Sequence, residues 1–172
     1  TALGVAASEG MERLVMTNVY GRVFVVDTAS RKVVFERNIF SSLAQALTLG
    51  PHGALIGAGS KSGVASVTTV DTQREQILAG HVGHVTAIAI DATERGALTA
   101  GADATVRLWD IAGIPGRATL LVNTPLHADI SSDGSRILTA SRDGAARLFD
   151  RASGAQIVAV PGASDTLNSA VF

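Results

Sequence analysis

GADATVRLWD, at residues 101–110, is the stretch that decides the fold, and three related stretches accompany it. They read SRDGAARLFD at 141–150, NVYGRVFVVD at 18–27 and, more loosely, SKSGVASVTTVD at 60–71. Each consists of a tight turn, an apolar strand and a closing aspartate. Those aspartates are Asp27, Asp71, Asp110 and Asp150, so the steps between them are 44, 39 and 40 residues. A period of about 40–45 residues is typical of a four-stranded propeller blade.

Turn residues and β-branched residues divide each repeat into four strands. The third repeat is the clearest, with strands expected at 84–90, 97–101, 105–110 and 117–123. Some strands, such as VFVV at 23–26, are apolar on both sides, which indicates burial on both faces. A blade sandwiched between two neighbours has that environment. The sequence therefore predicts an all-β propeller.

The repeats account for nearly the whole chain. We predict four antiparallel, four-stranded blades and the first strand of a fifth, at about 1–38, 39–80, 81–123, 124–162 and 163–172. Because the chain begins at Thr1 and ends inside the apolar run LNSAVF, we expect it to be a piece of a longer protein.

The composition limits the classes of function. The chain is 47% hydrophobic and 17% charged, which is a globular composition. The net charge is −1 and the basic residues are scattered, so a nucleic-acid footprint is not supported. The lack of cysteine excludes disulfides and thiolate metal sites. No apolar run approaches the ~18 residues of a membrane span. We expect no cofactor and no membrane partner.

The third repeat resembles the WD-repeat family, on two pairs of residues. These are Gly80-His81 at its start and Trp109-Asp110 at its end. The resemblance covers essentially the whole chain. It implies a ring that is most often seven-bladed, and a ring of that size needs more than 172 residues. Because an open arc exposes apolar flanks, we expect closure by missing residues of the same chain or by another subunit.

The resemblance also implies a hydrogen-bonded chain inside the third blade, formed by His81, Thr99, Asp103 and Trp109. A fully paired network of this kind favours one arrangement, whereas a half-paired one costs stability.

The other repeats depart from this pattern. The fourth retains Thr139 and Asp143 but has Leu121 where the histidine should align, so its network is not expected to close. Val26 and Val70 take the tryptophan position in the first and second repeats.

Two histidine patterns invite a chemical interpretation. His81 and His84 form an HxxH pair, but a strand–turn–strand path does not hold both imidazoles on one face, and we predict no metal site. His127 and Asp129 point to one side of an innermost strand, where they could act in acid–base chemistry. We favour a hydrogen-bonded structural pair, because no activated nucleophile accompanies them.

Lys61 and Arg142 lie in turns between second and third strands. In the family that the chain resembles, those turns lie on one face of the disc, which often binds partners. We take the two residues as a candidate protein-binding surface, with solvated charges as the alternative.

Three functions are compared. The first is a non-catalytic scaffold that binds other proteins in a multiprotein complex, inside the cell in the cytoplasm, the nucleus or a cytoskeletal or ciliary assembly. The alternative is a module that recognises a peptide or a modified residue at the centre of the disc. The least favoured is a propeller enzyme, and we predict no catalytic residues.

Overall fold

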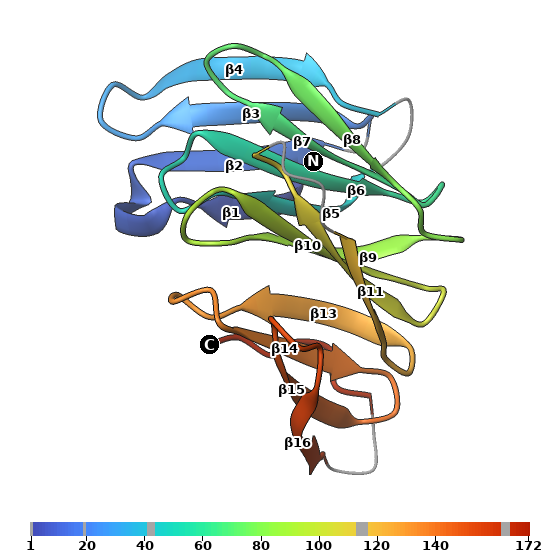
Figure 1. The fold of residues 1–172 in the computed structure, drawn as a ribbon. Helices are drawn as coiled ribbons and strands as arrows, with labels where there is room; N and C mark the ends of the chain where they lie inside the picture. The colour runs from blue at the N-terminus through green and yellow to red at the C-terminus, as the bar shows by residue number, and fades with distance from the viewer. Residues whose placement is uncertain (1, 19, 41–43, 113–116, 163–165) are drawn as a thin grey trace.

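Four four-stranded sheets follow one another along the chain (Figure 1). The structure is a computed structural model that describes residues 2–18, 20–40, 44–112, 117–162 and 166–172. Every sheet is antiparallel, and its strands lie in sequence order. The prediction of an all-β fold built from four-stranded blades is confirmed.

The sheets are numbered here in chain order. Sheet 1 contains β1 (Ala2–Ala7), β2 (Arg13–Asn18), β3 (Arg22–Asp27) and β4 (Lys32–Asn38), and a short 3-10 helix, η1 (Glu9–Met11), lies between its first two strands. Sheet 2 contains β5 (Ala44–Leu49), β6 (Leu55–Ser60), β7 (Val64–Thr69) and β8 (Glu75–Ala79). Sheet 3 contains β9 (Val85–Ile90), β10 (Gly96–Gly101), β11 (Thr105–Asp110) and β12 (Arg117–Leu121). Sheet 4 contains β13 (Pro125–Ile130), β14 (Arg136–Ser141), β15 (Ala145–Asp150) and β16 (Gln156–Pro161).

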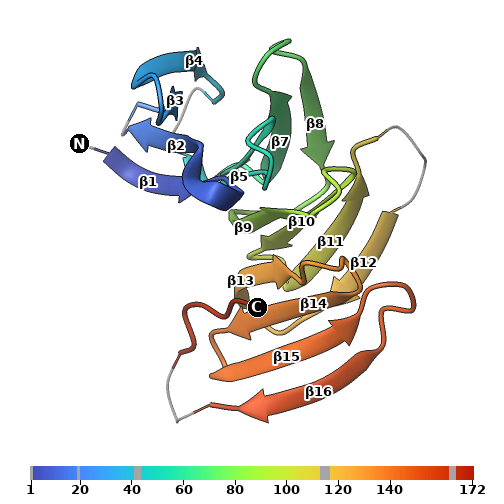
Figure 2. The same ribbon diagram turned by 90° about the vertical axis from the view of Figure 1, so that its left-hand side faces the viewer.

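The sheets stand side by side in an arc (Figure 2). The first strands, β1, β5, β9 and β13, lie innermost, and each contacts the first strand of the next sheet. The fourth strands lie on the outside. This is the arrangement of propeller blades around an axis.

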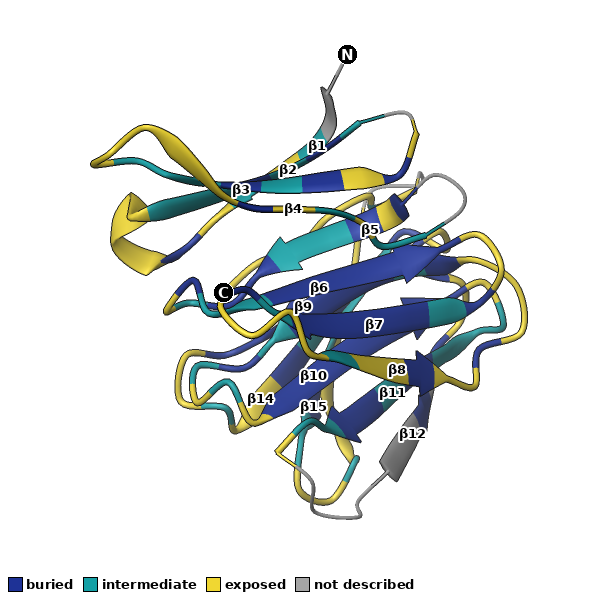
Figure 3. Cartoon of the chain, turned by 90° about the horizontal axis from the view of Figure 1, so that it is seen from above, coloured by how far each residue is buried: buried dark blue, intermediate teal, exposed yellow. Residues whose placement is uncertain are grey.

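The hydrophobic core lies between the sheets. One apolar cluster joins sheets 1 and 2, a second joins sheets 2 and 3, and a third joins sheets 3 and 4. β6, β7 and β10 are therefore buried along most of their length, whereas much of β8 is exposed (Figure 3). Burial on both faces explains why these strands lack polar–apolar alternation.

The turns between second and third strands share one backbone conformation. Gly21, Gly63 and Gly144 have φ values of 76°, 86° and 80° at the residue before the third strand. The third sheet has Ala104 at this position, with φ 61°. A left-handed conformation suits glycine and strains alanine.

The register of sheet 2 corrects the positions that the sequence analysis gave to Val70 and Asp71 in the second repeat. β7 ends at Thr69, which pairs with the first residue of β6 as Asp110 pairs with the first residue of β10. Thr69 therefore takes the closing position and Thr68 the aromatic position, whereas Val70 and Asp71 lie in the following turn. The run of β-branched residues concealed the strand end. In sheet 3, the strand bounds differ from the predicted ones by at most two residues.

Residues 166–172 were expected to open a fifth blade, but they form no strand. The Leu167 N–H donates to Ser141 O at 3.1 Å and the Phe172 N–H donates to Asp129 Oδ2 at 3.1 Å, so the segment lies against sheet 4. A β-strand forms by hydrogen bonding to a neighbouring strand, and no described strand lies beside this segment to form a fifth sheet with it. The number of blades in a closed ring stays a prediction.

Candidate functional site

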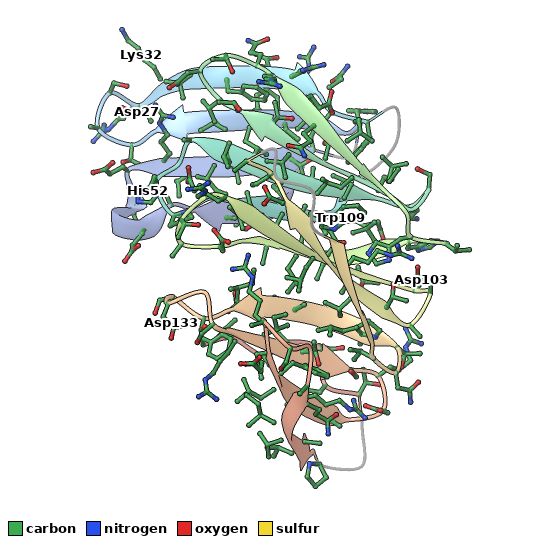
Figure 4. The ribbon with its side chains drawn as sticks, viewed as in Figure 1. Asp27, Lys32, His52, Asp103, Trp109 and Asp133 are labelled. Atoms are coloured by element: carbon green, nitrogen blue, oxygen red, sulfur yellow. The ribbon has the colours of Figure 1, made fainter. Side chains whose placement is uncertain are left out.

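A chain of three buried side chains crosses sheet 3. The His81 Nε2 and Thr99 Oγ1 atoms lie 2.8 Å apart, and the Trp109 Nε1–H donates to the same hydroxyl oxygen at 2.8 Å. Figure 4 labels Trp109. All three residues are buried. The hydroxyl of Thr99 can donate to the neutral imidazole while it accepts from the indole, so one threonine serves both rings.

Asp103 extends this chain to the turn between β10 and β11. Its Oδ1 lies 2.9 Å from His81 Nδ1 and accepts from the Thr105 hydroxyl at 2.7 Å, and its Oδ2 accepts from the Val82 N–H at 3.0 Å. Burial raises the pKa of Asp103, but these hydrogen bonds outweigh burial and lower the pKa to about 2. An ionised Asp103 favours the His81 tautomer with the proton on Nδ1.

Thr105 was missed in the sequence analysis. A hydroxyl residue two positions after a turn aspartate commonly donates to that carboxylate, and this local pattern was the available signal.

Sheet 4 uses different partners at the equivalent positions. The Arg147 Nη2–H donates to Asp143 Oδ2 at 2.6 Å, and the Asn123 side-chain amide donates to the same oxygen at 3.2 Å. Thr139 reaches only the carbonyl oxygen of Arg147, at 3.5 Å. The side chain of Leu121 lies outside the described residues. Asn123 and Arg147 thus bind Asp143, whereas a histidine binds the equivalent Asp103 in sheet 3. The sequence analysis named neither Asn123 nor Arg147.

Comparison with known families agrees with this geometry. The model of the WD domain, G-beta repeat, matches residues 72–110 and 124–150. These two matches support a WD-repeat family for the chain. A search of curated proteins found no significant match. WD repeats generally mediate protein–protein interactions and are typically non-catalytic.

One end of the arc carries the connections between successive sheets and the turns between second and third strands, and we call it the connector rim. It consists of the turns and connections at 61–63, 80–84, 102–104, 122–124 and 142–144. Backbone hydrogen bonds join these segments, such as that from the Ala102 N–H to His84 O at 2.8 Å.

Lys61 and Arg142, the predicted binding residues, are both exposed on the connector rim. They come from sheets 2 and 4, so sheet 3 separates them. Val82 lies between them along the chain and is 78% exposed. The structure therefore places the two cations on one rim without bringing them together.

His84 and His127 are the two other histidines that the sequence analysis singled out. His84 is exposed, outside β9. His127 Nδ1 is buried without a hydrogen-bond partner among the described residues, and Asp129 accepts from the backbone N–H groups of Ile130 and Phe172. The expected hydrogen bond between His127 and Asp129 is thus not formed, because the backbone takes both carboxylate oxygens.

A cavity of about 350 Å³ opens where the innermost strands of all four sheets meet. Its wall includes apolar side chains and the carboxylate residues Glu9 and Asp129. Among the described residues, no group of three or more His, Asp or Glu could hold a metal ion, and no helix is long and apolar enough to cross a bilayer.

Proposed function

We propose that this chain is a non-catalytic WD-repeat scaffold that binds other proteins, through its connector rim, within an intracellular multiprotein complex. The observation that carries the proposal is the position of Val82. Its backbone N–H is held by Asp103 at 3.0 Å, whereas its side chain is 78% exposed. The polar network thus holds the backbone that carries an exposed apolar side chain, and a surface that is ordered before binding loses less entropy on association.

Two further features support binding at this rim. Tyr20, in the corresponding turn of sheet 1, is 80% exposed, and tyrosine is enriched at protein interfaces. Lys61 and Arg142 add two cations to the same rim. An apolar anchor with charged neighbours has the composition of an interface that forms and dissociates.

The test is a pull-down from the native source in gentle salt, with three baits. We expect wild type to recover partners in constant proportion, and Val82→Asp to lose them. The matched control is Val33→Asp, because Val33 is also exposed (54%) but lies on the outer strand β4. Recovery of the bait alone from wild type, or equal recovery with Val82→Asp, would contradict the proposal.

Recognition at the centre of the disc is the second candidate, and the cavity of about 350 Å³ favours it. Its wall carries Glu9 and Asp129, which suits a basic peptide better than a phosphorylated one. Retention of partners by the Val82→Asp bait but loss by Glu9→Gln would favour this site over the rim.

The exposed flank of sheet 4 also needs a partner. Val160 pairs with the second residue of β15 and is 56% exposed, whereas Leu78, at the equivalent position of sheet 2, is 2% exposed. We propose that another blade covers this flank in the assembled protein, supplied by the same chain or by another subunit.

A further inference from the structure

A second cavity, of about 280 Å³, opens between sheets 2 and 3 at the end opposite the connector rim. Leu55, Val67 and Ile111 provide apolar walls, and Thr69, Arg74, Gln76 and Ala112 complete the lining. It lies at the start of β6 and β8 and at the end of β7. The cavity is therefore distinct from the central one and from the proposed binding rim.

Arg74 is the cation of this cavity. It is exposed in the turn between β7 and β8, and its backbone N–H is held by the Thr72 hydroxyl at 3.4 Å. Within the described part of the chain, its guanidinium forms no ion pair or hydrogen bond. Two carboxylates on the neighbouring strands are engaged elsewhere, since Glu75 pairs with Arg37 at 3.2 Å and Asp110 accepts from the Ala112 N–H at 2.8 Å.

Arginine–carboxylate pairs join the sheets on either side of the other two spaces. Between sheets 1 and 2, Arg13 Nη2 lies 3.6 Å from the Asp71 carboxylate. Between sheets 3 and 4, Arg151 Nη2 lies 2.9 Å from the Asp91 carboxylate. In both cases one sheet supplies the guanidinium and its neighbour supplies the carboxylate.

Among the described residues, no arginine–carboxylate pair joins sheets 2 and 3, although the Gln76 side-chain amide donates to Asp110 O at 3.3 Å. Leu55 occupies the position of Arg13, because both open the second strand and pair with the last residue of the third. Ala112 occupies the position of Asp71, two residues after that last residue. The smaller apolar side chains leave space where sheets 1 and 2 have an ion pair, and Arg74 lines that space.

We propose that this cavity binds the carboxylate side chain of an acidic partner peptide. The aliphatic part of a glutamate side chain would lie against Leu55, Val67 and Ile111, and its carboxylate would accept hydrogen bonds from Arg74. The planar guanidinium matches a carboxylate, and charge-assisted hydrogen bonds are stronger than neutral ones. The proposal rests on the proposed function in that the ligand belongs to a partner protein, and it names a site away from the rim.

The probe is N-acetylglutamate methylamide, titrated into the full chain while amide chemical shifts are recorded. The neutral N-acetylglutamine methylamide is its matched control. We expect saturable shifts at the cavity residues with the glutamate compound only, and affinity weaker by about fivefold in Arg74→Gln, the effect of one exposed charge pair. Equal shifts with both compounds, no shifts at the cavity, or unchanged affinity in Arg74→Gln would overturn the proposal.

A second variant fills the cavity from within. Leu55→Arg with Ala112→Asp rebuilds the pair of sheets 1 and 2, and we expect the folded variant to lose binding of the glutamate compound. Binding by the folded variant would count against the site, and if the variant does not fold, Arg74→Gln decides. Because no partner protein is used, a negative result leaves the scaffold proposal standing, and a failed pull-down leaves this site standing.

Discussion

The guanidinium of Arg151, in the turn after β15, lies 2.9 Å from the carboxylate of Asp91, in the turn after β9. The Asp91 side chain is 2% exposed, and its other oxygen accepts from the hydroxyl and N–H of Thr93 and the N–H of Arg95. The pair therefore connects sheets 3 and 4 through a carboxylate that the local turn has already oriented.

Arg151→Met should destabilise the chain by about 1–3 kcal/mol, because it removes a charge-assisted hydrogen bond from a buried carboxylate. The control is Arg22→Met, which removes a pair of similar length (2.8 Å to Glu36) whose side chains are about half exposed. Exposed pairs contribute only about 0–1 kcal/mol. Equal losses in urea denaturation would show that Arg151 acts as an ordinary surface charge.

Thr99→Val should cost about 1–3 kcal/mol, because it removes the buried hydroxyl that both His81 Nε2 and the Trp109 indole N–H contact. The matched control is Thr139→Val in sheet 4, where the hydroxyl is buried but reaches only one carbonyl oxygen, at 3.5 Å. We expect a clearly smaller loss there. Similar unfolding free energies for the two variants would refute a stabilising role for the network.

Acid should weaken the folded state through Asp103. Its pKa is about 2 when folded, below the ordinary value of 3.8, so its contribution to stability is complete above pH 3.8. That contribution is lost as the pH falls through 2. Asp103→Asn should therefore be less stable at neutral pH and show a shallower decline below pH 4, measured by thermal unfolding from pH 7 to pH 2. An unchanged acid limb in the variant would be inconsistent with this origin.

Ala104→Gly should stabilise the chain by up to about 1 kcal/mol, because alanine at φ 61° is strained and glycine is not. The reverse change at the equivalent turn of sheet 4, Gly144→Ala, should destabilise by a similar amount. Differential scanning calorimetry of both variants checks the signs. A lower melting temperature for Ala104→Gly would mean that the added freedom of the unfolded chain outweighs the relieved strain.

Val160→Lys should change the free energy of unfolding by no more than about 0.5 kcal/mol, since the side chain is already 56% exposed. It should also reduce self-association of the chain, because a lysine on an exposed outer strand opposes edge-to-edge pairing. Leu78→Lys, at the equivalent but buried position, should prevent stable folding. Sedimentation measures the self-association of the two variants, and urea denaturation measures their free energy of unfolding. Loss of folding in Val160→Lys would show that the flank is covered.

The sequence by itself determined the repeat and the four-stranded sheets, and the family resemblance implied the sheet 3 network except for Thr105. Turn residues and β-branched runs act over a few positions, and a period near 40 residues makes the same local signals recur. The prediction from the sequence misplaced the end of β7, because the β-branched run from Val67 to Val70 continues past Thr69, the last paired residue.

The tertiary structure decided what depends on contacts between sheets. Only packing shows that Arg151 reaches Asp91, that backbone groups take both oxygens of Asp129, and that Leu55 leaves a cavity. The equivalent valine and leucine at 160 and 78 differ in exposure because one faces solvent and the other a neighbouring sheet. An apolar run predicts that a strand is buried, but it does not say which side chain of another blade, about 40 residues away, each residue meets. The pairs between blades could therefore not be predicted from the sequence.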